Sequence, residues 1–210
     1  MAQNAGYCAP YRRRREGKTD YKARKALVLS GKPRLVIRGS LQNMIAQVVI
    51  AKPEGDQVLV SAHSRELGKY EWKTNKGNLP AAYLTGLLCG SKAKTKGIAE
   101  AIPDIGLHSP SKGARVFAVL KGVLDAGVNV PHSEEKLPDE KRTKGEHIVR
   151  YAKDLASDQK AYQSRFSAYL RQELPPENLP ENFEKVKKNI VSSFKSGVKK
   201  VESSKKKPKA

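Results

Sequence analysis

The chain has 210 residues, enough for one domain with a hydrophobic core. Its hydrophobic content of 38% is low for such a domain, so we expect extensions outside the core. The formal net charge of +20 at pH 7 predicts a polyanionic partner. The two cysteines exclude a disulfide framework and favour a reducing cytosol. The sequence shows neither a secretory signal nor an apolar run of about 18 residues, so we expect no membrane contact.

The first 26 residues are interpreted as an extended basic arm. Residues 1–34 carry ten Lys/Arg and two acidic residues, a net charge of +8. The arm lacks the alternation of a strand, although a short helix is expected at residues 20–26. Its four consecutive arginines, Arg12 to Arg15, repel one another unless a polyanion neutralises them. We therefore expect the arm to face the polyanionic partner.

Residues 27–131 are predicted to form the core domain, which begins with three strand-like runs. Residues 34–38 and 43–50 are joined by a connection of hairpin length, and residues 57–64 follow a turn that contains proline and glycine. Three strands on short loops predict an antiparallel meander.

Helical periodicity follows the meander. Asn78 is expected to cap a helix that begins at Leu79, and Gly86 and Gly90 in this helix are expected to allow close packing on the sheet. A fourth strand is expected at residues 97–102, and "VNV" before Pro131 is a candidate to return to the sheet.

A second helix is expected to begin at Ser109 and Pro110, because a capping residue followed by proline is typical of a helix start. It is expected to end at Gly127, which stands where a C-terminal cap glycine belongs. The resulting order, βββαβα, predicts a two-layer α/β domain in which helices cover a mixed sheet.

Residues 132–210 are predicted to be a linker and a helical, lysine-rich C-terminal extension. The composition of residues 131–147 indicates an exposed linker, and apolar spacing then predicts helices near residues 148–170 and 183–194. Residues 185–210 carry ten lysines and one acid, a net charge of +9. We interpret this lysine-rich end as a solvated tail that binds phosphate without fixed geometry.

No motif predicts catalysis, a metal site or a cofactor. The chain has no dinucleotide or phosphate-loop spacing, and its four histidines stand apart from one another. Asp104, His108 and Ser109 are too close together in one loop to form a nucleophilic triad. We therefore expect a protein that is not an enzyme.

The arm favours structured RNA over a membrane as the partner. Arginine forks bind phosphate in a bidentate way, and tyrosines offer stacking surfaces for unpaired bases. The arm combines its arginines with Tyr7, Tyr11 and Tyr21.

The sequence also resembles a known family. "YRRRREGKTDYKARKALVL" and the following "KPRLVIRGSLQNMIAQVV" are similar to the large-subunit ribosomal protein that binds 5S ribosomal RNA, the universal eighteenth large-subunit protein in its archaeal and eukaryotic form. Further matching segments are "GDQVLVSAHSREL", "NLPAAYLTGLL", "DIGL" and "GARVFAVLKGVLDAGVNVPHS". The resemblance spans residues 7–170, with its motifs in the expected order.

The resemblance implies a structural role in the cytoplasmic ribosome. A small α/β domain would bind 5S rRNA and attach it to the large-subunit rRNA at the central protuberance, beside neighbouring ribosomal proteins. Two alternatives stay open: an RNA-recognition subunit of an RNA-modifying enzyme, and a general nucleic-acid-compacting protein. The second alternative predicts charge spread over the whole fold rather than concentrated at its two ends.

The predicted RNA-binding residues lie in three places. In the arm they are Tyr11, Arg12, Arg13, Arg14, Arg15, Lys18, Thr19, Tyr21, Lys22, Arg24 and Lys25. Pleating of the predicted sheet adds Arg34, Arg38, Ser40, Asn43 and Gln47, for which an ordinary exposed polar face is an equal alternative. In the following loop, Trp72 is expected either to stack on a base beside Lys73 or to cap the core.

Overall fold

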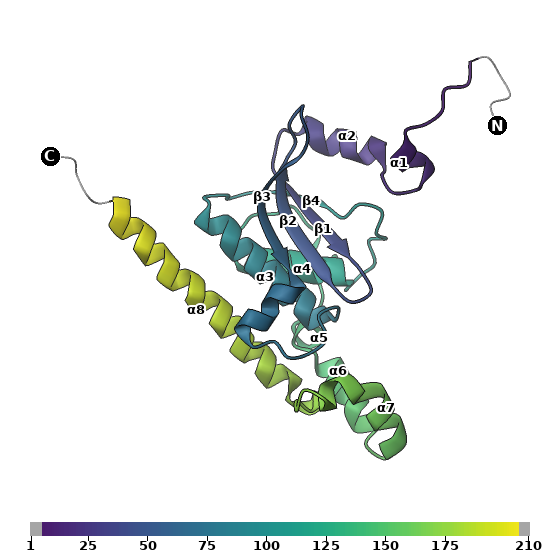
Figure 1. Ribbon diagram of the computed structural model, residues 1–210, viewed down its shortest axis with the longest axis vertical. Coiled ribbons are helices and arrows are strands. Elements are labelled where there is room, and N and C mark those ends of the chain that lie inside the picture. Colours follow the sequence, from purple (N-terminus) through teal and green to yellow (C-terminus); the bar gives the residue numbers. More distant parts are fainter. Residues whose placement is uncertain (1–5, 206–210) are drawn as a thin grey trace.

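The computed structural model describes residues 6–205, with side chains as far as residue 194. Its centre is a four-stranded sheet in the order β3-β2-β1-β4, with α3 (Leu79–Thr95) and α4 (Arg115–Asp125) on one face (Figure 1). The strands are β1 (Arg34–Gly39), β2 (Met44–Ile50), β3 (Gln57–His63) and β4 (Ile102–Asp104). The first three pair antiparallel, and β4 joins β1 in parallel. The predicted α/β fold with a mixed sheet is confirmed.

Strand alternation decides which side chains face the helices. Leu35 and Ile37 of β1, with Met44 and Ala46 of β2, are fully buried in the core. The alternate positions point to the opposite face, which carries polar side chains such as those of Arg34, Arg38 and Gln47. The 3-10 helix η1 (Ser64–Tyr70) follows β3 and leads into the loop before α3.

The fourth strand lies later in the chain than we predicted. Within residues 97–102, Glu100 forms a bridge with Asn129, but the strand paired with β1 begins only at Ile102. The reason is Gly97, whose φ of +76° shows that the chain is still turning after α3. The "VNV" segment does return toward the sheet, because Ala101 N donates to the Asn129 carbonyl oxygen at 3.0 Å.

Helix α3 begins where predicted, because Asn78 Oδ1 accepts a hydrogen bond from Ala81 N at 2.9 Å. The predicted start of α4 is wrong. Residues 109–114 are irregular apart from a turn at residues 112–113, where Gly113 has a φ of +65°, and the helix begins only at Arg115. Gly127 follows the helix at φ +93°, as expected of a cap glycine.

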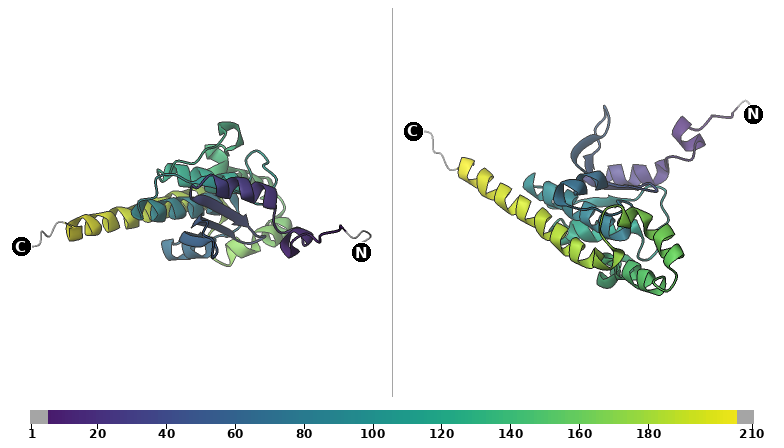
Figure 2. Two further views of the ribbon diagram at one scale, coloured as in Figure 1. Left: turned by 90° about the horizontal axis from the view of Figure 1, so that it is seen from above. Right: turned by 60° about the horizontal axis from the view of Figure 1, so that its bottom comes forward.

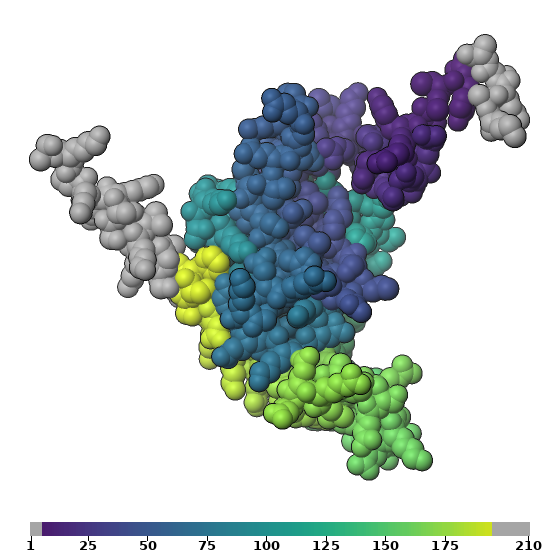
Figure 3. Space-filling model, in the orientation of Figure 1, coloured from purple at the N-terminus to yellow at the C-terminus, as the bar shows by residue number. Residues whose placement is uncertain are grey.

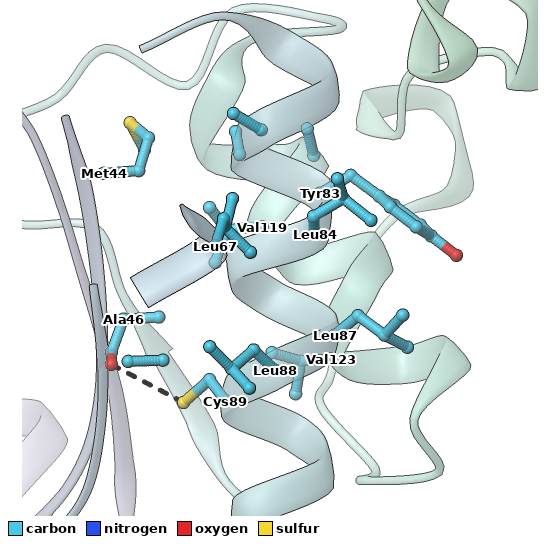
Figure 4. Close-up of a cluster of buried hydrophobic side chains, with 14 of the residues drawn as sticks. Met44, Ala46, Leu67, Tyr83, Leu84, Leu87, Leu88, Cys89, Val119 and Val123 are labelled. Atoms are coloured by element: carbon cyan, nitrogen blue, oxygen red, sulfur yellow. Dashed lines mark hydrogen bonds between the residues drawn. The ribbon is translucent and has the colours of Figure 1, made fainter. Parts of the chain in front are cut away.

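The glycines of α3 face α4 rather than the sheet, which corrects our expectation. A Cβ on Gly86 would collide with the Val119 carbonyl oxygen of α4, and one on Gly90 would lie 2.6 Å from Ala126 Cβ. The sheet-facing side of α3 carries larger residues, and Cys89 Sγ lies 3.6 Å from the Ala46 carbonyl oxygen (Figure 4). Burial raises the pKa of the Cys89 thiol to about 12, so this cysteine is an inert core residue.

The N-terminal arm contains two helices, α1 (Arg12–Arg15) and α2 (Tyr21–Leu29), and projects from one end of the sheet (Figures 1 and 2). A helix is present where residues 20–26 predicted one, but it continues to Leu29. The predicted arm boundary at residue 26 therefore falls inside α2.

The C-terminal segment is helical and shares the core. It contains the 3-10 turns η2 (Glu134–Lys136) and η3 (Pro176–Asn178), and the helices α5 (Glu140–Lys144), α6 (Glu146–Asp154), α7 (Gln159–Leu170) and α8 (Leu179–Lys205). The Phe183 ring of α8 packs 5.4 Å from the Tyr83 ring of α3, measured between centroids. None of the helices within residues 6–205 is long and apolar enough to cross a membrane.

Two expectations for this segment are only partly right. Residues 131–147 are not simply an exposed linker, because Thr143 is buried and a Cβ on Gly145 would lie 2.7 Å from Leu179 Cδ2. The helix predicted at residues 148–170 is divided, because α6 ends at Asp154 and the Asp158 carboxylate caps a new helix, α7.

Candidate nucleic-acid interface

Local hydrogen bonds define the path of the arm. Asp20 Oδ1 caps α2 by accepting from the backbone N–H groups of Lys22 and Ala23, at 2.9 and 3.1 Å. Arg13 Nε donates to Thr19 Oγ1 at 2.9 Å, which closes the turn between the two helices. Gly17 allows this turn, with φ at +63°. Thr19 and Asp20 therefore act in the structure of the arm itself.

The cations of α1 face solvent. All four arginines, Arg12 to Arg15, are exposed, and none of the residues of α1 is buried. The ion pairs of Glu16 with Arg12, at 3.7 Å, and with Lys18, at 2.8 Å, stay within the arm. Exposed pairs of this kind contribute little to stability, so these cations remain available to a polyanion.

Two tyrosines stand beside the arginines. The Tyr11 ring lies 5.2 Å from the Tyr21 ring, between centroids, at a tilt of 45°. Tyr11 is 72% exposed. An exposed aromatic face next to arginines is suited to stacking on an unpaired base.

A cleft of about 980 Å³ lies between the arm and the β4 edge of the sheet. In Figure 3 the arm projects from the body on this side. The cleft brings together six of the predicted RNA-binding residues, namely Arg13, Lys18, Thr19, Tyr21, Arg24 and Arg38. Its opposite wall is formed by residues 102–108, which follow β1 by some 70 positions in the sequence.

Two aspartates and three arginines form a continuous series of ion pairs, which we call the Asp–Arg chain; Arg24, Asp104 and Arg38 of this series line the cleft. Arg24 Nη2 donates to both carboxylate oxygens of Asp56, each at 2.9 Å. Arg34 Nη2 donates to Asp56 Oδ2 at 2.7 Å, and its Nη1 to Asp104 Oδ2 at 3.0 Å. Arg38 Nη2 donates to Asp104 Oδ1 at 2.8 Å. The order is therefore Arg24–Asp56–Arg34–Asp104–Arg38.

Arg34 and Arg24 keep the Asp56 carboxyl group ionised. Partial burial is the largest single effect and opposes ionisation. The hydrogen bonds and positive charges of Arg34 and Arg24 together outweigh it, so the pKa of Asp56 is lowered from its ordinary value of 3.8. Asp56 is consequently a carboxylate at neutral pH.

Arg34 is buried, which contradicts its prediction as a surface contact to RNA. Only 1% of the residue is exposed, because Asp56 and Asp104 cover its guanidinium on the outer face of β1. Its Nε has no hydrogen-bond partner among the described residues. A buried arginine needs such carboxylate partners, so Arg34 holds the fold together rather than binding RNA.

Arg38 is fixed in place but still accessible. Its Nη1 donates to the carbonyl oxygens of Ile37 and Asp104, at 2.8 and 2.7 Å, and its side chain is 44% exposed. Gly106, at φ +63°, allows this arrangement, since a Cβ there would lie 2.9 Å from the guanidinium carbon of Arg38. The structure thus presents Arg38 to the cleft as a pre-positioned cation.

The other predicted sheet residues are held by neighbours. Ser40 Oγ accepts from Asn43 N at 3.0 Å, and Asn43 Oδ1 accepts from Ser64 Oγ at 3.3 Å. Gln47 Nε2 donates to Ser61 Oγ at 3.3 Å. Ser40 is exposed, whereas Asn43 and Gln47 are half-buried. Their contact with RNA stays a prediction.

Trp72 belongs to the core, so stacking on a base is the wrong alternative. The residue is 2% exposed, and its Nε1 donates to the Asn75 carbonyl oxygen at 3.2 Å. Lys73 next to it is exposed.

Sequence reasoning missed several residues of this face. Nothing in the local pattern marks Asp56 or Asp104 as partners of arginines, because the four segments involved, α2, β1, the β2–β3 loop and β4, meet only in the fold. Arg65 and Lys76 also lie near His63, and the pKa of His63 is lowered, first by burial and then by the positive charge of Arg65. The exposed Arg65 thus adds positive charge beyond the arm.

A comparison with protein-family models identifies the family of this chain. The family model described as ribosomal large subunit proteins 60S L5 and 50S L18 matches residues 6–103 and 91–133. These segments include both helices of the arm, the whole sheet and the Asp–Arg chain. They cover more than half of the chain. This protein therefore belongs to the family of large-subunit ribosomal proteins that includes 60S L5 and 50S L18.

Proposed function

We propose that this ribosomal protein binds 5S rRNA and helps to attach it to the large-subunit rRNA at the central protuberance of the cytoplasmic ribosome. Family membership makes the chain a structural constituent of the large subunit, with rRNA and ribosomal proteins as its neighbours. The choice of 5S rRNA rests on the motif resemblance of the arm and sheet together with their geometry. The observation that carries the proposal is the exposed cluster of arginines and tyrosines beside a cleft.

Contacts with phosphates would provide most of the affinity for RNA, and protein groups with fixed positions would set the orientation of the RNA. Each arginine of α1 that meets a phosphate releases condensed counterions, which provides attraction without selecting a sequence. Arg38 adds a cation whose position is set by the sheet, so the RNA must present a phosphate at that point. The exposed Tyr11 ring offers a stacking surface for a base that is not paired.

The proposed contacts follow from these positions. Arg34 and Trp72 are left out because they are buried. Thr19 is assigned to the turn of the arm, and Arg24 to its ion pair with Asp56. The direct contacts that we propose are Tyr11, Arg12, Arg13, Arg14, Arg15, Lys18, Tyr21, Lys22, Lys25, Arg38, Ser40, Asn43, Gln47 and Lys73.

Sequencing the RNA that copurifies with the protein tests the proposal. The protein is isolated from cells after the ribosomes have been dissociated, and the bound RNA is extracted and sequenced. One dominant short ribosomal RNA is the expected result. A mixed pool of RNA and DNA would instead identify a general compacting protein, and the proposal would be withdrawn.

A further inference from the structure

Within the described residues, and apart from the local hydrogen bonds that end α2, one polar side-chain contact links the arm to the rest of the protein. The side chains of residues 6–29 make several hydrogen bonds and ion pairs within the arm. Among the described residues, the ion pair of Arg24 with Asp56 is the one that connects these side chains to the α/β domain. Helix α2 has no buried residue, and its half-buried positions, Tyr21, Arg24 and Leu27, form a single stripe. The orientation of α2 therefore depends on the contact between Arg24 and Asp56.

Asp56 is itself held by the sheet. It lies in the loop between β2 and β3, and its ion pair with Arg24 brings this loop into contact with α2 (Figure 1). Arg34 binds Asp56 Oδ2 at 2.7 Å, and Asp104 of β4 fixes Arg34 from the other side. The anchor of α2 thus runs through a buried arginine into two strands.

The Asp–Arg chain also connects the two walls of the cleft. Arg24, at one end of the chain, lines the wall formed by α2, and Arg38, at the other end, lines the wall formed by β1 and residues 102–108. While the ion pairs of the Asp–Arg chain are intact, they fix the distance between the two walls of the cleft before RNA binds. Such pre-organisation removes part of the ordering cost of binding.

We propose that Asp56 is a positioning residue for RNA binding. Its ion pair with Arg24, which we call the clasp, fixes α2 relative to Arg38 and so favours an RNA whose phosphates match that geometry. A general polyanion gains nothing from a fixed spacing, because it binds equally well to a loose arm. Asp56 would thereby contribute to selectivity although it carries a negative charge on a surface that binds RNA. The selectivity part of this proposal depends on the proposed function, whereas the clasp itself does not.

The sign of the effect separates positioning from simple electrostatics. Asp56→Asn removes a negative charge, so electrostatics alone predicts tighter binding to every RNA. Positioning predicts weaker binding to 5S rRNA and no loss for transfer RNA. Glu54→Gln is the matched control, because Glu54 is exposed in the same loop and makes the same charge change without touching the clasp.

The first measurement is made on the full-length protein without RNA. Heteronuclear NMR relaxation of the backbone amides of α2 should show greater mobility in Asp56→Asn and in Arg24→Gln, but not in Glu54→Gln. Asp56→Asn also weakens the contact with the buried Arg34, so it can lower the thermal midpoint. Arg24→Gln breaks the clasp but leaves the bonds of Arg34 to Asp56 and Asp104 in place, so it tests the clasp without that effect. Unchanged α2 mobility in both variants would overturn the clasp, whatever RNA the protein binds.

The second measurement compares dissociation constants for 5S rRNA and transfer RNA. We expect Asp56→Asn to weaken 5S rRNA binding about three- to tenfold, as for the loss of a pre-organised contact. The double variant, which combines Arg24→Gln with Asp56→Asn, should bind 5S rRNA no more weakly than Arg24→Gln alone, because the two side chains act as one unit. If Asp56→Asn binds 5S rRNA as tightly as Glu54→Gln does, the positioning role is refuted. If the wild-type protein does not prefer 5S rRNA, the proposed function fails, and the NMR result still decides on the clasp.

Discussion

The exposed turn Arg12–Arg15 offers a direct test of how the arm binds RNA. Replacing all four arginines by alanine should leave the thermal midpoint almost unchanged. The structure gives the reason: none of the four is buried, and their ion pair and hydrogen bond remain within the arm. Alanine is also the best helix former, so the single turn of α1 does not oppose the change. Circular dichroism during heating checks this expectation.

Binding should suffer in the same variant. Each lost phosphate contact flattens the slope of log affinity against log salt by roughly 0.7–0.9, so four contacts amount to about 3. Titration of fluorescently labelled 5S rRNA at several salt concentrations measures this slope. A change of well under about 1, with affinity preserved, would show that the arginines form a solvated tail and would refute the reasoning.

A lysine variant at the same four positions separates charge from geometry. Lysine preserves the charge, so the salt slope should be retained. It lacks the planar fork that binds phosphate in a bidentate way and stacks on bases, so affinity should lie between those of the wild type and the alanine variant. Equal affinity of the lysine variant and the wild type would mean that charge alone matters.

Three further predictions concern stability and the C-terminus. Gly86→Ala should lower the free energy of unfolding by about 3 kcal/mol or more, because its Cβ would meet the backbone of α4. Urea titration measures this change. Gly68→Ala is the control and should change little, because a Cβ there meets nothing within 4 Å. Because the folded-state pKa of Asp56 lies below its ordinary value of 3.8, its ionised form stabilises the fold above that pH, and this contribution is lost as the pH falls through the lowered pKa. Asp56→Asn should therefore reduce the fall in thermal midpoint below about pH 4, measured against Glu54→Gln; identical acid profiles would contradict it. Deleting the last twelve residues, whose side chains lie outside those described, should weaken RNA binding modestly and keep the preference for 5S rRNA over transfer RNA; loss of that preference would count against a nonspecific lysine tail.

The sequence predicted those features of the fold that depend on local patterns. Alternating apolar residues located β1 to β3, and the cap at Asn78 located the start of α3. The starts of β4 and α4 were wrong, because left-handed turns at Gly97 and Gly113 keep the chain irregular beyond the expected positions. Local pattern does not reveal which glycine will bend the chain in this way.

The candidate site was predicted in its composition but not in its organisation. Exposed arginines and tyrosines of the arm could be recognised, because their sequence pattern is unusual for a folded core. Arg34 was misassigned since its partners, Asp56 and Asp104, stand 22 and 70 positions away. Trp72 was left with two alternatives, and its burial in the hydrophobic core decides between them. Long-range partners of this kind follow from the topology of the sheet.

Selective binding of 5S rRNA is the central claim, and an equilibrium competition measures it most directly. Wild-type protein is titrated with labelled 5S rRNA at about 0.15 M salt, the physiological ionic strength, with unlabelled transfer RNA as competitor. We predict that 5S rRNA is preferred by at least about 100-fold, as expected for specific recognition above a nonspecific electrostatic background. Equal dissociation constants for the two RNAs would contradict the account.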